Sequence, residues 1–136
     1  MTTLIDTNVL LDLVTDDPVW ADWSTRQLES ASLRGPLMIN DIVYAELSIG
    51  YERIEALDEA VSQMGLLVER LPASALFLAG KAFLSYRRTA GAKGGVLPDF
   101  FIGAHAAILG IPLLTRDVKR YNRYFAGLAL ISPTST

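Results

Sequence analysis

Short apolar runs alternate with longer amphipathic stretches along this chain, and this alternation predicts its secondary structure. Short runs of consecutive apolar residues are typical of buried strands. Such runs occur at residues 4–5, 37–39, 66–68, 112–114 and 128–131. The stretches between them repeat their apolar positions at helical spacing. They predict helices over residues 18–33, 52–64, 73–88, 98–109 and 118–125, and a further helix across residues 42–47.

Strands that alternate with helices predict an α/β fold in which a parallel sheet is covered by helices on both faces. Two of the predicted helices begin with capping signals. Asp17 precedes Pro18, and Asn40 or Asp41 precedes the helix across residues 42–47. The chain has 136 residues, a size that suits one hydrophobic core, so we expect residues 1–136 to form a single domain.

Four acidic residues lie where an apolar segment gives way to a helix: Asp6, Glu46, Asp99 and Asp117. Asp6 follows the first predicted strand, Asp117 follows the fourth, and Glu46 lies on the helix after the second. In open parallel sheets, ligands bind outside the carboxyl ends of the strands. Converging carboxylates repel one another unless a cation compensates them. The pattern therefore indicates divalent-metal chemistry on a phosphate-bearing substrate.

Mg²⁺ and Mn²⁺ are hard cations that prefer carboxylate and water oxygens. Four carboxylates suit a site for two ions, or for one ion beside a partly occupied second position. Such a site holds the scissile phosphate, lowers the pKa of a bound water and stabilises the leaving oxygen. Asp99 would lie in the first turn of a helix, where the helix dipole favours its ionised form. Thr7, Asn8 and Thr115 are placed to orient the ligands by hydrogen bonds.

Each acidic residue also has a purely structural interpretation. Asp6 and Asp117 are plausible helix caps, and Asp99 beside Pro98 suits the first turn of any helix. Glu46 is harder to explain in this way because its neighbours are mainly apolar. His105 is the single histidine, but helical geometry points it about 120° away from Asp99. We therefore interpret it as a helix-face residue and not as a catalytic base.

Composition narrows the functional classes. The chain has no cysteine, which excludes disulfides and thiolate sites and suits a reducing cytoplasm. The first residues lack the features of a signal peptide, and no apolar stretch is long enough to span a membrane. The net charge of −3 is atypical of a basic nucleic-acid binder. It does not exclude a nuclease, because the four acids themselves account for that charge.

The motifs around the four acids resemble those of the PIN-domain family, in particular the VapC-type toxins of toxin–antitoxin pairs. The resemblance covers nearly the whole chain. The stretches that carry it are Ile5-Asp6-Thr7-Asn8-Val9-Leu10-Leu11-Asp12, Tyr44-Ala45-Glu46-Leu47, Pro98-Asp99-Phe100-Phe101-Ile102-Gly103-Ala104-His105-Ala106, Leu114-Thr115-Arg116-Asp117 and Ile131-Ser132-Pro133. Two positions depart from the usual pattern, Gly103 in place of alanine and Tyr121 in place of phenylalanine, and we expect neither to touch the acids.

The resemblance implies a three-layer α/β/α fold and a Mg²⁺- or Mn²⁺-dependent endoribonuclease that uses metal-activated water. It implies that Asp6, Glu46, Asp99 and Asp117 are both the catalytic and the metal-binding residues. By the same resemblance, Asn8 and Thr115 support the site, the protein forms a homodimer, and a cognate antitoxin places its C-terminal segment over the active site. RNA would be the substrate, and Arg87, Lys93, Arg116 and Lys119 are candidates to contact its backbone.

Three alternatives stay open at this point. A haloacid-dehalogenase-type phosphatase also starts with a strand-borne aspartate, but it needs an acid where this chain has Asn8. A receiver-like phosphoacceptor domain needs an acidic neighbour beside Asp6, which is missing. The third alternative is a PIN-like module that binds a partner protein without catalysis.

Overall fold

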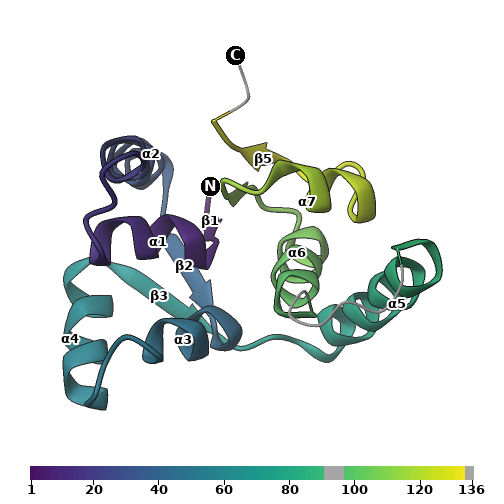
Figure 1. Cartoon of the computed structure of the whole chain (residues 1–136), viewed down its shortest axis with the longest axis horizontal. Helices are drawn as coiled ribbons and strands as arrows, with labels where there is room; N and C mark the ends of the chain where they lie inside the picture. The colour runs from purple at the N-terminus through teal and green to yellow at the C-terminus, as the bar shows by residue number, and fades with distance from the viewer. Residues whose placement is uncertain (91–96, 134–136) are drawn as a thin grey trace.

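The computed structural model describes residues 1–90 and 97–133, in which a five-stranded sheet lies between helices (Figure 1). The predicted Lys93 lies outside these residues. Among the described helices, none is long and apolar enough to cross a membrane. The elements in chain order are β1 (Thr3–Ile5), α1 (Thr7–Val14), α2 (Ala21–Arg34), β2 (Leu37–Asn40), α3 (Asp41–Ser48), α4 (Ile54–Gln63), β3 (Leu66–Glu69), α5 (Ala73–Ala90), α6 (Leu97–Leu109), β4 (Leu113–Leu114), α7 (Val118–Tyr124) and β5 (Leu130–Ile131).

All neighbouring strands pair in parallel, in the order β3-β2-β1-β4-β5. The chain thus starts in the middle of the sheet, builds outwards to β3, and crosses back to add β4 and β5 on the other side. In Figure 1, α1 to α4 lie on one side of the sheet and α5 to α7 on the other, as right-handed crossovers would place them for this strand order. The predicted three-layer α/β/α fold with a parallel sheet is confirmed. The strand order reverses between β1 and β4, and such a switch point is where ligands bind.

The middle of the sheet is the core of the protein. Leu4 and Ile5 of β1 are fully buried, as are Leu113 and Leu114 of β4. The prediction that residues 66–68 form a buried strand is only partly correct. β3 does form there, but only its first residue, Leu66, is buried. Its later residues are exposed because β3 is an edge strand, and the apolar pattern alone does not reveal that position.

The predicted helix over residues 18–33 begins later than expected. α2 starts at Ala21, and Asp17 caps a turn before it, where its Oδ1 accepts hydrogen bonds from the amides of Val19 and Trp20 at 2.9 and 2.8 Å. Of the two capping candidates for α3, the structure selects Asn40, whose Oδ1 accepts from the amide of Val43 at 2.9 Å. The other helices with a predicted range agree with it to within two or three residues at each end, whereas α1 was indicated only by Asp6 as a plausible cap.

Candidate active site

Asp6 lies at the carboxyl end of the central strand, beside the switch point. Its backbone amide donates to the carbonyl of Leu114 at 2.9 Å, which ties the end of β1 to the end of β4. Its side chain caps α1, because Oδ1 accepts from the amide of Thr7 at 2.7 Å. The position of Asp6 therefore agrees with its interpretation as a helix cap and also with its interpretation as a site residue. The cap fixes the carboxylate at the edge of the sheet where a ligand would bind.

The second oxygen of Asp6 receives hydrogen bonds from three side chains. Thr115 Oγ1 donates to Oδ2 at 2.7 Å, Tyr121 Oη at 3.0 Å and Asn8 Nδ2 at 3.3 Å. Asp6 is only 3% exposed, and this burial raises its pKa, although the hydrogen bonds from Thr115, Tyr121 and Thr7 act in the opposite direction. The carboxylate is consequently held in one orientation by donors from α1, from the residue after β4 and from α7.

Asn8 and Thr115 contact Asp6, as the sequence led us to expect, and they also connect the two sides of the switch point. Asn8 Oδ1 accepts from the amide of Arg116 at 3.2 Å. Thr115 Oγ1 accepts from the amide of Asp117 at 3.0 Å. These bonds fix the corner between β4 and α7 against the start of α1. The position of Asp117 thus depends on the same two side chains that orient Asp6.

Glu46 reaches the site from α3 and is held by a neighbour of Asp6. Thr7 Oγ1 donates to Glu46 Oε1 at 2.5 Å. Partial burial raises the pKa of Glu46, and the negative charge of Asp99 raises it further, while the Thr7 hydrogen bond lowers it. Thr7 therefore serves two acids, since its amide binds Asp6 and its hydroxyl binds Glu46.

Asp99 enters from the first turn of α6. Its pKa is raised to about 6, chiefly by burial and also by the negative charge of Asp6, against the opposing effect of Arg120. The favourable position at a helix N-terminus therefore does not decide the pKa of Asp99 in the metal-free protein, and the rise agrees with our expectation that converging carboxylates repel one another. Burial beside other carboxylates outweighs the favourable position at the helix N-terminus.

Three of the four predicted acids face one cavity. A hollow of about 420 Å³, here called the carboxylate cavity, is lined by Asp6, Thr7, Asn8, Leu11, Glu46, Ile49, Gly50 and Asp99. Asp117 is not among these lining residues. It occupies the N-cap position of α7, yet its side chain makes no capping hydrogen bond. Instead its Oδ2 lies 3.2 Å from Nη1 of Arg120, and the same nitrogen also pairs with Asp99 Oδ2.

Sequence reasoning missed two residues of α7 that contact the acids, Arg120 and Tyr121. The expectation that Tyr121 does not touch the acidic residues is wrong, because its fully buried hydroxyl donates to Asp6. Gly103 lies beside the ring of Tyr121, which makes this contact. A Cβ atom there would lie 2.7 Å from the ring of Phe125 and 3.0 Å from that of Tyr121. The signal that could have found both residues is helical spacing, since positions three and four after Asp117 share its helix face.

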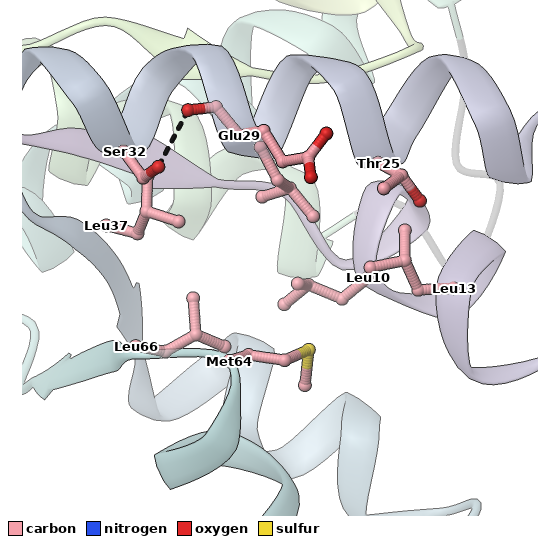
Figure 2. Close-up of a pocket in the computed structure, with 9 residues that line it drawn as sticks. Leu10, Leu13, Thr25, Glu29, Ser32, Leu37, Met64 and Leu66 are labelled. Atoms are coloured by element: carbon pink, nitrogen blue, oxygen red, sulfur yellow. Dashed lines mark hydrogen bonds between the residues drawn. The ribbon is translucent and has the colours of Figure 1, made fainter.

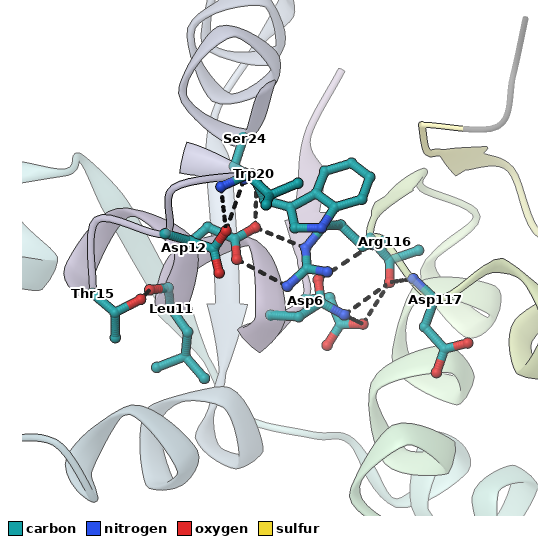
Figure 3. A network of polar contacts seen from close by, with 12 residues as sticks. Asp6, Leu11, Asp12, Thr15, Trp20, Ser24, Arg116 and Asp117 are labelled. Atoms are coloured by element: carbon teal, nitrogen blue, oxygen red, sulfur yellow. Dashed lines mark hydrogen bonds and ion pairs between the residues drawn. The ribbon is translucent and has the colours of Figure 1, made fainter. Parts of the chain in front are cut away.

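Arg116 forms a separate network beside the site. Its Nε and Nη2 atoms pair with both carboxylate oxygens of Asp12 at 2.8 and 2.9 Å, and Ser24 Oγ donates to Asp12 at 2.7 Å. The guanidinium also lies over the ring of Trp20, 5.0 Å from its centroid (Figure 3). Arg116 thus connects the β4–α7 corner to α1 and α2. We considered its side chain for RNA binding, and in the structure it is engaged in these contacts. Lys119 and Arg87 are exposed.

His105 lies away from the acids. It is buried on α6, and its Nδ1 is 3.1 Å from the side-chain nitrogen Nδ2 of Asn40. It lines a different cavity, together with Leu67 and Glu69 of β3, so its position agrees with the structural interpretation. A further hollow, between α1, α2 and the strands β2 and β3, is mostly apolar, and Glu29 is the one charged residue that lines it (Figure 2).

The donor chemistry of the carboxylate cavity fits a hard divalent cation. Its three carboxylates are oxygen ligands, and each of them has a raised pKa, which a bound cation would lower again. Within the described part of the chain, no three acidic or histidine side chains already form a closed ligand cluster. Mg²⁺ does not require one, because it usually keeps several waters and takes one or two protein carboxylates.

Comparison with known proteins supports the same fold. The family model described as PIN domain matches residues 3–125. No curated protein matches the sequence. Solved structures of similar fold include VapBC2 from Rickettsia felis bound to a promoter DNA fragment, VapBC-1 from nontypeable Haemophilus influenzae, and a toxin–antitoxin complex from Klebsiella pneumoniae.

The three matches extend over nearly the full length of both chains. For the Rickettsia structure the TM-score is 0.75 at 22% identity, with 97% of this chain and 98% of that chain covered. The Haemophilus structure gives 0.71 at 20% identity, with 97% and 98% covered. The Klebsiella structure gives 0.66 at 22% identity, with 96% and 97% covered.

Proposed function

Because this chain belongs to the PIN domain family, we propose that it is a divalent-metal-dependent endoribonuclease and the toxin of a toxin–antitoxin pair. The observation that carries the proposal is the carboxylate cavity. Asp6 comes from the junction of β1 and α1, Glu46 from α3 and Asp99 from α6, and the three line one hollow at the carboxyl edge of the sheet. That is the position at which open parallel sheets bind their ligands.

In the proposed mechanism, Asp6, Glu46 and Asp99 hold Mg²⁺ or Mn²⁺. When bound, the ion supplies Lewis acidity towards the scissile phosphate and lowers the pKa of a water molecule. The chain itself contributes orientation. Thr115, Tyr121 and Asn8 fix Asp6, and the hydroxyl of Thr7 fixes Glu46. A reaction of this kind needs no 2′-hydroxyl, so the products would carry a 5′-phosphate and a 3′-hydroxyl.

The proposed partners follow from the fold matches. Similar chains occur in toxin–antitoxin complexes, so we expect a cognate antitoxin whose C-terminal segment covers the carboxylate cavity. We also expect a homodimer and action on cytoplasmic RNA. Unstacked bases in a loop of structured RNA are the preferred target of sequence-specific readers. Lys119 and Arg87 are exposed cations that would contact the RNA backbone.

The test is cleavage of purified total RNA with Mn²⁺ and with EDTA. We expect cleavage with Mn²⁺ only, and loss of cleavage in Asp6→Asn. Asp16→Asn is the matched control, because Asp16 is an exposed aspartate just after α1 and its positive φ of 49° is tolerated by asparagine. Products that end in a 2′,3′-cyclic phosphate would contradict the mechanism. Absence of Mn²⁺ binding in calorimetry would instead favour a module that only binds a partner.

A further inference from the structure

Arg120 is the one cation that contacts the predicted acids among the described residues. Its Nη1 atom pairs with Asp99 Oδ2 and lies 3.2 Å from Asp117 Oδ2. About a quarter of the Arg120 side chain is exposed, so the ion pairs are partly protected from solvent and hold the guanidinium at the edge of the site. Arginine keeps its charge at all relevant pH values.

This contact divides the four acids into two groups. Asp6, Glu46 and Asp99 line the carboxylate cavity, whereas Asp117 lies outside it and is paired with Arg120. Asp99 belongs to both groups: it lines the cavity, and its Oδ2 receives Arg120. If a second ion were bound, it would have to be held at Asp99 and Asp117, because Asp117 is the one predicted acid that does not line the carboxylate cavity. The guanidinium already occupies that position.

We propose that Arg120 takes the place of a second metal ion, so that the protein binds a single divalent ion in the carboxylate cavity. The inference rests on the metal dependence of the proposed function and specifies its metal content. A second divalent ion between Asp99 and Asp117 would lie next to the positive guanidinium and would be repelled by it. Asp117 then serves to position Arg120 and does not bind the metal ion.

The direct test is the stoichiometry of Mn²⁺ binding, measured by isothermal titration calorimetry on the metal-free protein without RNA. We expect one ion per chain in the wild type and two ions, the second weaker, in Arg120→Gln. Arg123→Gln is the matched control: it removes the same charge from the same helix, but that guanidinium lies over the ring of Tyr124. The control should bind one ion. A wild type that binds two ions, or an Arg120→Gln variant that still binds one, would overturn the inference.

A second variant keeps the test independent of how Arg120→Gln folds. If Asp117 is not a metal ligand, Asp117→Asn should change the affinity for Mn²⁺ by less than about fivefold, the size of a partly exposed ion pair. Asp6→Asn should remove measurable binding. If Asp117→Asn lost as much affinity for Mn²⁺ as Asp6→Asn, the inference that Asp117 is not a metal ligand would be overturned. If the wild type bound no Mn²⁺, the proposed nuclease function would itself fail, whereas binding of two ions would refute only the role of Arg120.

Discussion

The hydrogen bond from Tyr121 to Asp6 allows a quantitative test of how the site is built. Tyr121→Phe removes the hydroxyl and keeps the ring, so the packing of the ring beside Gly103 is preserved. The lost bond joins a fully buried phenol to a carboxylate that is 3% exposed, at 3.0 Å. Hydrogen bonds to charged groups contribute about 1.5–3 kcal/mol. Because Thr115 and Asn8 still donate to the same oxygen, we expect a loss of about 2 kcal/mol at neutral pH.

The loss should depend on pH in a defined direction. Burial raises the pKa of Asp6, and the Tyr121 hydrogen bond lowers it, so Tyr121→Phe should raise this pKa further. A raised folded-state pKa means that stability is present below the unfolded pKa and is lost as pH rises through the folded value. The variant should therefore lose most stability relative to wild type above the pKa of Asp6. The difference should shrink as pH falls below the folded-state pKa of Asp6, because the protonated carboxyl accepts only a neutral hydrogen bond, worth about 1 kcal/mol.

The assay is urea unfolding in EDTA at several pH values, followed by the fluorescence of Trp20 and Trp23. Tyr44→Phe is the matched control, because its hydroxyl also donates to a carboxylate, Asp58 Oδ1 at 2.6 Å, but at an exposed position. A loss in Tyr121→Phe no larger than in Tyr44→Phe, or one independent of pH, would refute the reasoning. RNA cleavage should fall by about 10–100-fold, as is typical when a partner of a metal ligand is removed.

Three further outcomes follow from the site and its surroundings. Since the pKa of Asp99 is raised to about 6, protons should compete with Mn²⁺ there, and calorimetry should show affinity falling as pH drops from 8 to 5. Arg116→Met should cost about 3 kcal/mol in urea unfolding, because it leaves the carboxylate of Asp12, only 3% exposed, without its cation. Gly103→Ala should cost about 1–3 kcal/mol in the same assay, because the new methyl group would overlap the ring of Phe125.

Much of the fold, and the position of the acidic residues at one edge of the sheet, could be predicted from the sequence. Both follow from the order of strands and helices along the chain. Alternation of strands with helices sets a parallel sheet, and a parallel sheet brings the residues after its strands to one edge. Asp6 and Thr115 meet for this reason, although more than a hundred residues separate them. Glu46 could be identified because a carboxylate among apolar neighbours needs a partner, and it has one in Thr7.

The rest depends on tertiary packing that no local pattern encodes. Apolar residues occur equally in central and edge strands, so the exposure of Leu67 in β3 was not predictable. Repulsion between converging carboxylates predicts a raised pKa, but the larger cause for Asp99 is its burial, and that depends on how α6 packs. In the sequence, Arg120 is one of several cations near Asp117, and nothing local distinguishes it from the others. Its contact with Asp99 requires that α6 and α7 lie against each other at the switch point.

The short helix α7 brings these observations together. Arg120 and Tyr121 follow Asp117 by three and four residues, so the three side chains share one face of α7. That face is turned towards Asp6 and Asp99. This helix and its N-cap residue thus supply an acid, a cation and a phenol, while Lys119 is exposed. The position of α7 is fixed at its start, where Asn8 and Thr115 bind the backbone of residues 116 and 117. Any change that loosens this corner should therefore disturb the orientation of Asp6 and the pairing of Asp99 together.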